Sequence, residues 1–128
     1  MLDTNVCVVY LNGTDDGLRD RLLALPPSDV LLCSVVKAEL LFGARKSKRV
    51  DENLAQLARF FATLDCAPFD DLAAEHYGLL RAQLEAAGTP IGANDMMIAG
   101  TALATGATLV TRNQREFLRV SGLAVETW

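Results

Sequence analysis

The sequence is that of a small, slightly acidic protein. Its 128 residues are 51% hydrophobic and 22% charged, with a formal net charge of -4, as in ordinary globular domains. The negative charge argues against a general nucleic-acid-binding domain, which is usually basic, but not against a nuclease with acidic metal ligands. No apolar run approaches the ~18 residues of a membrane span. No basic segment precedes an apolar stretch as in a secretory signal, so we expect a cytoplasmic protein with no membrane partner.

The cysteines indicate neither a disulfide framework nor a zinc site. Cys7, Cys33 and Cys66 are widely spaced and odd in number, which fits neither pattern. With a single histidine in the chain, a His/Cys metal cluster is excluded. We expect the cysteines to be small buried side chains in a reducing compartment.

The predicted elements of the first half begin with a strand end at residues 1–3. Asn12-Gly13 closes the first helix, Pro26-Pro27 stops the second, and the wholly apolar run at 30–33 is typical of a buried parallel strand. We expect Asp15 or Asp16 to cap the second helix, and Ser34 to cap the third. In this half the sequence predicts helices at 5–11, 15–25, 34–44 and 50–64.

In the second half of the chain, predicted strands again alternate with predicted helices. The sequence predicts a short strand at 65–68, a helix at 70–87 ending before Gly88 and a helix from 93 to about 106. A strand at 107–110, a short turn or helix at 116–117 and a last strand at 123–125 follow. Strands separated by helices and short loops indicate an α/β fold. We predict one domain over residues 1–128, with three α/β/α layers around a central, mostly parallel sheet.

Asp3 is the first candidate for a functional acid. It directly follows the first apolar residues, and a carboxylate there is costly unless it is paired, hydrogen-bonded or bound to a cation. The carboxyl edge of a parallel sheet is also where α/β folds bind ligands. The simpler alternative is that Asp3 caps the helix that begins near Thr4.

Two further acids stand in apolar helices. Glu39 lies past the first turn of its helix, too late for a capping box; the alternatives are a solvated side chain or a partner in Lys37 or Lys46. Asp95 lies near the start of its helix, where it could be the N-cap, a role that Asn94 could fill equally well.

The last candidates follow the strand at 107–110. Asn113 and Glu116 lie where that strand ends, and the alternative is a polar turn in which Arg115 and Arg119 neutralise Glu116. Several carboxylates converging at one edge would repel one another and raise their pKa values. A divalent cation such as Mg²⁺ or Mn²⁺, which prefers oxygen ligands, removes that repulsion. Such a site supports phosphodiester hydrolysis.

These residues resemble the PIN-domain ribonucleases, and within them the VapC toxins of bacterial toxin–antitoxin pairs. The matching segments are MLDTN at 1–5, SVVKAELLFGA at 34–44 and PIGANDMMIAGTALATGATLVTRNQREFLRVSGLAVETW at 90–128. In the family a few residues usually precede the first segment. We therefore expect either a very short first strand or a sequence that begins later than in the relatives.

The resemblance implies an Mg²⁺- or Mn²⁺-dependent endoribonuclease that cuts structured RNA such as tRNA and so inhibits translation. The metal ligands and catalytic acids would be Asp3, Glu39, Asp95 and Glu116. Asn113 stands where many relatives have Asp, so the sequence leaves open whether Asn113 or Glu116 fills the fourth position. Thr4, Asn5 and Thr111 would hydrogen-bond around the site.

The resemblance also implies partners. A cognate VapB-type antitoxin would cover the site, and the chain would form a homodimer and a larger assembly with the antitoxin. The side chains expected to contact RNA phosphates are Arg112 and Arg115, since backbone contacts come mainly from Lys and Arg. The basic segment at 37–49 is a weaker candidate, because a solvated helix end would have the same composition.

Two other functions remain as alternatives. An aspartyl-nucleophile phosphatase would use Asp3, but it requires a second acid two residues later, where the chain has Asn5. A PIN-like module without catalysis would only bind a partner. For the nuclease, we expect in-line attack of water on phosphorus, leaving a 5′-phosphate and a 3′-hydroxyl.

Overall fold

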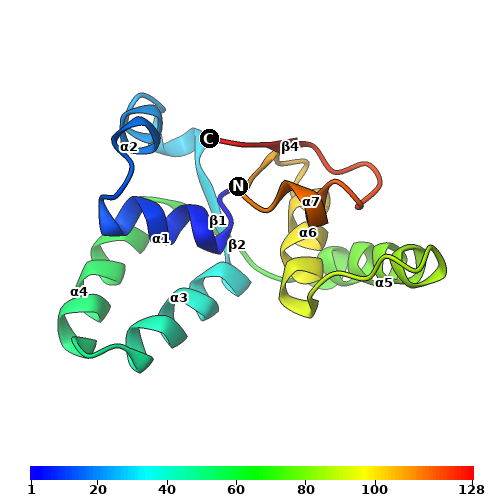
Figure 1. Ribbon diagram of the computed structural model, residues 1–128, viewed down its shortest axis with the longest axis horizontal. Coiled ribbons are helices and arrows are strands. Elements are labelled where there is room, and N and C mark those ends of the chain that lie inside the picture. The colour runs from blue at the N-terminus through cyan, green and yellow to red at the C-terminus, as the bar shows by residue number, and fades with distance from the viewer.

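The computed structural model describes residues 1–128 as an α/β protein in which short strands alternate with helices (Figure 1). The helices are α1 (Thr4–Asn12), α2 (Asp16–Leu23), α3 (Ser34–Lys46), α4 (Val50–Phe61), α5 (Asp71–Ala86), α6 (Ala93–Thr105) and α7 (Gln114–Phe117), with a 3₁₀ turn at Pro27–Asp29. The strands are β1 (Leu31–Cys33), β2 (Asp65–Ala67), β3 (Leu109–Val110) and β4 (Val125–Glu126). None of the helices is long and apolar enough to cross a membrane.

The first three residues join two strand pairs into one parallel sheet. β1 pairs with β2, and β3 pairs with β4, both in parallel. Leu2 forms a parallel bridge with Val110, and its N–H donates to the carbonyl of Leu31 at 3.0 Å. The resulting order is β2-β1-(1–3)-β3-β4, which places Asp3 at the carboxyl edge between β1 and β3. The short first strand expected from the sequence is thus held on both sides.

Helices flank this sheet on two sides. In Figure 1, α1 to α4 lie on one side of the strands and α5 to α7 on the other. α5 packs along α6, and the contact is close: a Cβ atom on Gly100 would lie 2.9 Å from the carbonyl oxygen of Ala73. The α/β fold with parallel strands predicted from the sequence is confirmed.

The helix boundaries confirm some of the predicted caps and correct others. Asp15 caps α2 by accepting a hydrogen bond from the N–H of Leu18, and Gly13 ends α1 in the left-handed conformation. The prediction that Ser34 is an N-cap is wrong: Ser34 is the first residue of α3, and Cys33 precedes it without a side-chain cap. Helix α3 also runs past Ala44, because its last turn continues to Lys46.

The three cysteines and the methionines of α6 show how the core is filled. Cys7 and Cys33 are buried, Cys66 is half-buried, and all three are free thiols. In α6, Met96 is buried and Met97 is half-buried. One hydrophobic core contains residues from the strands and from the helices on both sides of the sheet.

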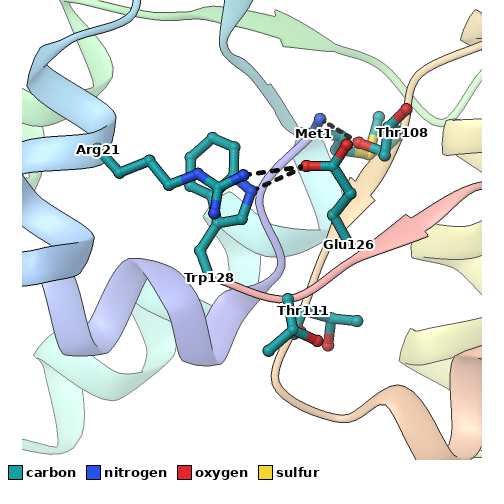
Figure 2. A network of polar contacts seen from close by, with 7 residues as sticks. Met1, Arg21, Thr108, Thr111, Glu126 and Trp128 are labelled. Atoms are coloured by element: carbon teal, nitrogen blue, oxygen red, sulfur yellow. Dashed lines mark hydrogen bonds and ion pairs between the residues drawn. The ribbon is translucent and has the colours of Figure 1, made fainter.

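The end of the chain is tied to α2 by polar contacts that Figure 2 shows. The indole N–H of Trp128 donates to Glu126 at 2.9 Å, and Arg21 lies 3.7 Å from the same carboxylate. The Arg21 guanidinium also lies 4.7 Å from the Trp128 ring centre, within the range of a cation–π contact. We call Arg21, Glu126 and Trp128 the C-terminal network.

Candidate metal centre

Asp3 is both a helix cap and a buried acid. Its Oδ1 accepts a hydrogen bond from the N–H of Val6 at 2.9 Å, and its Oδ2 accepts one from the Thr111 hydroxyl. The residue is only 4% exposed, and burial raises the pKa of its carboxyl while these hydrogen bonds oppose the rise. The capping alternative is therefore correct, but it satisfies only part of the carboxylate and provides no positive charge.

Glu39 enters the site from α3, which begins directly where β1 ends. Its Oε1 is buried and has no hydrogen-bond partner. The two lysines considered as partners lie elsewhere: the Lys37 ammonium is over the Phe61 ring and the Lys46 ammonium over the Phe42 ring. A buried acidic oxygen without a partner is costly, so this atom is available to a ligand.

Asp95 lies in the first turn of α6 but does not cap it. The N-cap is Gly92, so the capping roles suggested for Asp95 and Asn94 are wrong. Burial raises the pKa of Asp95 to about 6; the adjacent Glu116 carboxyl adds to the rise, as do the negative charges of Glu39 and Asp3. Asp95 therefore lies near enough to Glu116, Glu39 and Asp3 for these groups to affect its ionisation.

Glu116 comes from the single turn α7. Its Oε2 accepts a hydrogen bond from the Asn113 side-chain amide at 3.1 Å. Neither Arg115 nor Arg119 forms an ion pair with it; Arg119 instead donates to the Pro90 carbonyl. The alternative in which these arginines neutralise Glu116 is therefore wrong.

Open space adjoins the acids. A cavity of about 410 Å³ is lined by Glu39 and by the start of α6, namely Gly92, Ala93, Asn94 and Asp95. A second cavity of about 370 Å³ continues from Glu39 and Asn94 along α3 to Phe42. Solvent and a substrate can therefore reach Glu39 and Asp95 from outside.

The donors fit a hard divalent cation, although they do not enclose one by themselves. No group of three or more His, Cys, Asp or Glu side chains is arranged so that it could hold a metal ion as it stands. Mg²⁺, however, usually binds through one or two carboxylates and keeps several waters. The unpartnered Oε1 of Glu39 and the raised pKa of Asp95 are what such a cation would relieve.

The supporting residues differ in how closely they join the site. Thr111 is fully buried; its hydroxyl donates to Asp3 and accepts the Asn113 N–H at 2.9 Å. The hydroxyl of Thr4 is buried without a partner. Asn5 is exposed, and its side chain takes part in none of these hydrogen bonds.

The two arginines proposed to bind phosphate are exposed, but only Arg115 is free of ion pairs. Arg112 forms an ion pair with Asp15, and this contact lowers the pKa of the Asp15 carboxyl. Sequence reasoning missed this pair, because the two residues are 97 positions apart and no local pattern connects them. A phosphate at Arg112 would compete with Asp15.

Comparison with known proteins gives a consistent answer. The family model for the PIN domain matches residues 1–123. A tRNA(fMet)-specific endonuclease VapC of Shigella flexneri is 41% identical over 128 residues, spanning 100% of this chain and 96% of that protein. Ribonuclease VapC2 of Rickettsia felis is 40% identical over 129 residues, with the same coverage.

Solved structures agree in fold. VapBC2 from Rickettsia felis, bound to a DNA fragment from its promoter, matches with a TM-score of 0.94 at 39% identity, covering 100% of this chain and 97% of that one. DNA-bound VapBC from Salmonella typhimurium matches with a TM-score of 0.94 at 38% identity, covering 100% and 96%. The family match, the full-length relatives and the shared fold define the chain as a ribonuclease. The chain belongs to the PIN-domain family, among the VapC ribonuclease toxins.

Proposed function

We propose that this ribonuclease is an endonuclease that depends on Mg²⁺ or Mn²⁺ and cuts tRNA, with initiator tRNA(fMet) as the first candidate. The substrate is supported by the 41% identity, over the whole chain, to a tRNA(fMet)-specific endonuclease. The metal is supported by one observation above all: the buried Oε1 of Glu39 has no hydrogen-bond partner, and none of the four candidate acids forms an ion pair within the chain. Its site of action would be the cytoplasm.

Asp3 and Asp95 would be the principal ligands, with Glu39 and Glu116 completing the shell directly or through water. The bound cation would supply Lewis acidity and a water of lowered pKa. Asp3 is held in a fixed orientation by Val6 and Thr111, so it would position the cation rather than move with it. Glu39 Oε1, which has no partner, is the acceptor available for a proton of the attacking water.

Arg112 and Arg115 would hold phosphates of the RNA on either side of the scissile bond. Arg115 is exposed and outside every ion pair, which leaves its guanidinium available. Arg112 would exchange Asp15 for a phosphate, and this exchange costs part of the binding energy gained. We therefore propose that Arg115 contributes more to RNA affinity than Arg112.

The proposed partners follow from the solved relatives, which are VapBC assemblies. A VapB-type antitoxin would bind this chain and cover the acidic edge. A homodimer, and a larger assembly with the antitoxin, are further proposals. Light scattering of the chain alone and after mixing with its antitoxin would test both.

The deciding experiment is cleavage of purified initiator tRNA and of an elongator tRNA, each with Mg²⁺, with Mn²⁺ and with EDTA. We expect cleavage of the initiator tRNA that requires metal and leaves a 5′-phosphate. Activity that persists in EDTA would contradict the metal centre, and equal cleavage of both tRNAs would contradict the substrate. A phosphoaspartate at Asp3 would instead favour the phosphatase alternative, and no cleavage of any RNA would favour a binding module.

A further inference from the structure

Asn113 connects two acids that come from opposite ends of the chain. Its backbone N–H donates to the Thr111 hydroxyl at 2.9 Å, and that hydroxyl donates to Asp3. Its side-chain amide donates to Glu116 at 3.1 Å. One half-buried residue therefore lies in a continuous hydrogen-bonded path from Asp3 to Glu116.

The amide group matters because it gives the Glu116 carboxylate a neutral hydrogen-bond donor. Helix α7 is a single turn of four residues without a side-chain cap, and it contains no ion pair to Glu116. A carboxylate at position 113 would offer no proton to Glu116 and would repel it. The neutral amide instead donates a hydrogen and adds no charge beside Asp95, whose pKa the surrounding acids already raise.

We propose that Asn113 is a positioning residue of the metal centre: it does not bind the cation, but holds the Glu116 carboxylate toward Asp95. Outer residues of this kind orient metal ligands by hydrogen bonds to them. The inference rests on the proposed metal-dependent function. The sequence left open whether Asn113 or Glu116 fills the fourth acidic position. In this proposal Glu116 binds the cation and Asn113 orients Glu116.

The competing role is a direct one, in which the Asn113 amide oxygen binds the cation or its water. The two roles predict different effects when substitutions at Asn113 and Glu116 are combined. A residue that acts only through Glu116 loses its effect once Glu116 is gone, whereas an independent ligand keeps it. A double-mutant cycle therefore separates them.

The experiment measures Mn²⁺ affinity by calorimetry for the wild type, Asn113→Ala, Glu116→Ala and the double variant. We expect Asn113→Ala to weaken binding about tenfold, at the lower end of the range for outer-shell changes, and Glu116→Ala, which removes a ligand, to weaken it more. The double variant should bind within about twofold of Glu116→Ala. Gln114→Ala is the matched control: it removes an exposed amide from the next position in α7 and should leave the affinity unchanged. A double variant weakened by the product of the two single effects would overturn the proposal.

A second measurement needs no metal. In ¹⁵N-labelled, metal-free protein, the side-chain amide signal of Asn113 should move in Glu116→Ala and stay in place in Gln114→Ala. An Asn113 signal that ignores Glu116→Ala would overturn the positioning role. If the wild type binds no Mn²⁺ while the amide signal responds as expected, the proposed metal dependence fails and the hydrogen bond that orients Glu116 stands.

Discussion

The acidic edge of the sheet and the C-terminal network treat charge in opposite ways. In the C-terminal network, Glu126 is near the Arg21 guanidinium and accepts the Trp128 N–H. At the acidic edge, Glu39 has a buried oxygen with no partner, and burial raises the pKa values of Asp3 and Asp95. One region satisfies its charges within the chain, and the other does not.

The difference distinguishes charged side chains that serve the fold from charged side chains that are available to a ligand. Surface pairs such as Arg21 with Glu126 add little to stability, because solvent screens them and holding the two side chains in place costs entropy. Converging acids destabilise the folded chain, because desolvation and like charge both oppose their ionised form. Perturbed acids of this kind cluster at functional sites. Four substitutions test whether the two regions differ in this way, and they are given in decreasing order of expected effect.

Asp3→Asn should abolish function while leaving the fold in place. The amide keeps an oxygen to cap α1 at Val6 but lacks the negative charge that a cation requires. We expect RNA cleavage to fall at least about 100-fold, since loss of a ligand exceeds the 10–100-fold typical of outer-shell residues. Circular dichroism should show an unchanged helix content; cleavage at the wild-type rate would contradict the assignment of Asp3.

Glu39→Gln should reduce activity without destabilising the protein. It removes the charge from a side chain whose Oε1 has no partner. Cleavage should fall about 10- to 100-fold, while thermal unfolding in EDTA should be unchanged or occur at a higher temperature, as is common when a functional charge is removed. The pKa of Asp95 should also fall, since the Glu39 charge contributes to raising it. A clear loss of stability would indicate that Glu39 has a structural role instead.

Asp95→Asn should flatten the pH dependence of stability in metal-free protein. Because the pKa of Asp95 rises from 3.8 to about 6 on folding, the folded state binds more protons between these values. Stability should therefore fall as pH rises through that window. The shift corresponds to roughly 3 kcal/mol, which we reduce to about 1–2 kcal/mol because Asp95 is half exposed.

Urea denaturation of the wild type and Asp95→Asn at several pH values between 4 and 7, with EDTA, measures this difference directly. Adding Mn²⁺ at pH 7 should restore stability to the wild type and not to the variant. Parallel pH profiles for the two proteins would contradict the raised pKa.

Arg21→Ala should have the smallest effect. It removes the ion pair with Glu126 and the contact with the Trp128 ring, both at the surface. We expect the free energy of unfolding to fall by less than about 1 kcal/mol and RNA cleavage to be unchanged. A large loss of activity would show that the two regions are coupled.

Local signals in the sequence were sufficient for the α/β class and for choosing the four acids that we propose as metal ligands. Asp3 follows apolar residues, and Glu39 interrupts an apolar helix without a capping role, so both were visible from their neighbours. Helix ends were less certain: α2 stops at Leu23 and α4 at Phe61, before their predicted ends. Apolar periodicity continues into the following loop and does not mark the last hydrogen-bonded turn.

The contacts that organise the site were not predictable. The bonds from Thr111 to Asp3 and from Arg112 to Asp15 connect residues 108 and 97 positions apart, and they depend on side-chain rotamers. The sequence could place Asn113 near Glu116, but only the structure shows that its amide donates to that acid. Such details follow from packing rather than from spacing.

The position of the first strand has a consequence for synthesis of the chain. Residues 1–3 are hydrogen-bonded to both β1 and β3, and Asp3 also accepts a hydrogen bond from Thr111. Contacts this distant in sequence form late, since closing a long loop costs entropy before any contact repays it. Nearly the whole chain therefore has to leave the ribosome before residues 1–3 can pair with β3 and the proposed metal centre can assemble. A truncated or nascent copy carries Asp3 without the strand that completes its site, and we expect it to be harmless to the cell that makes it.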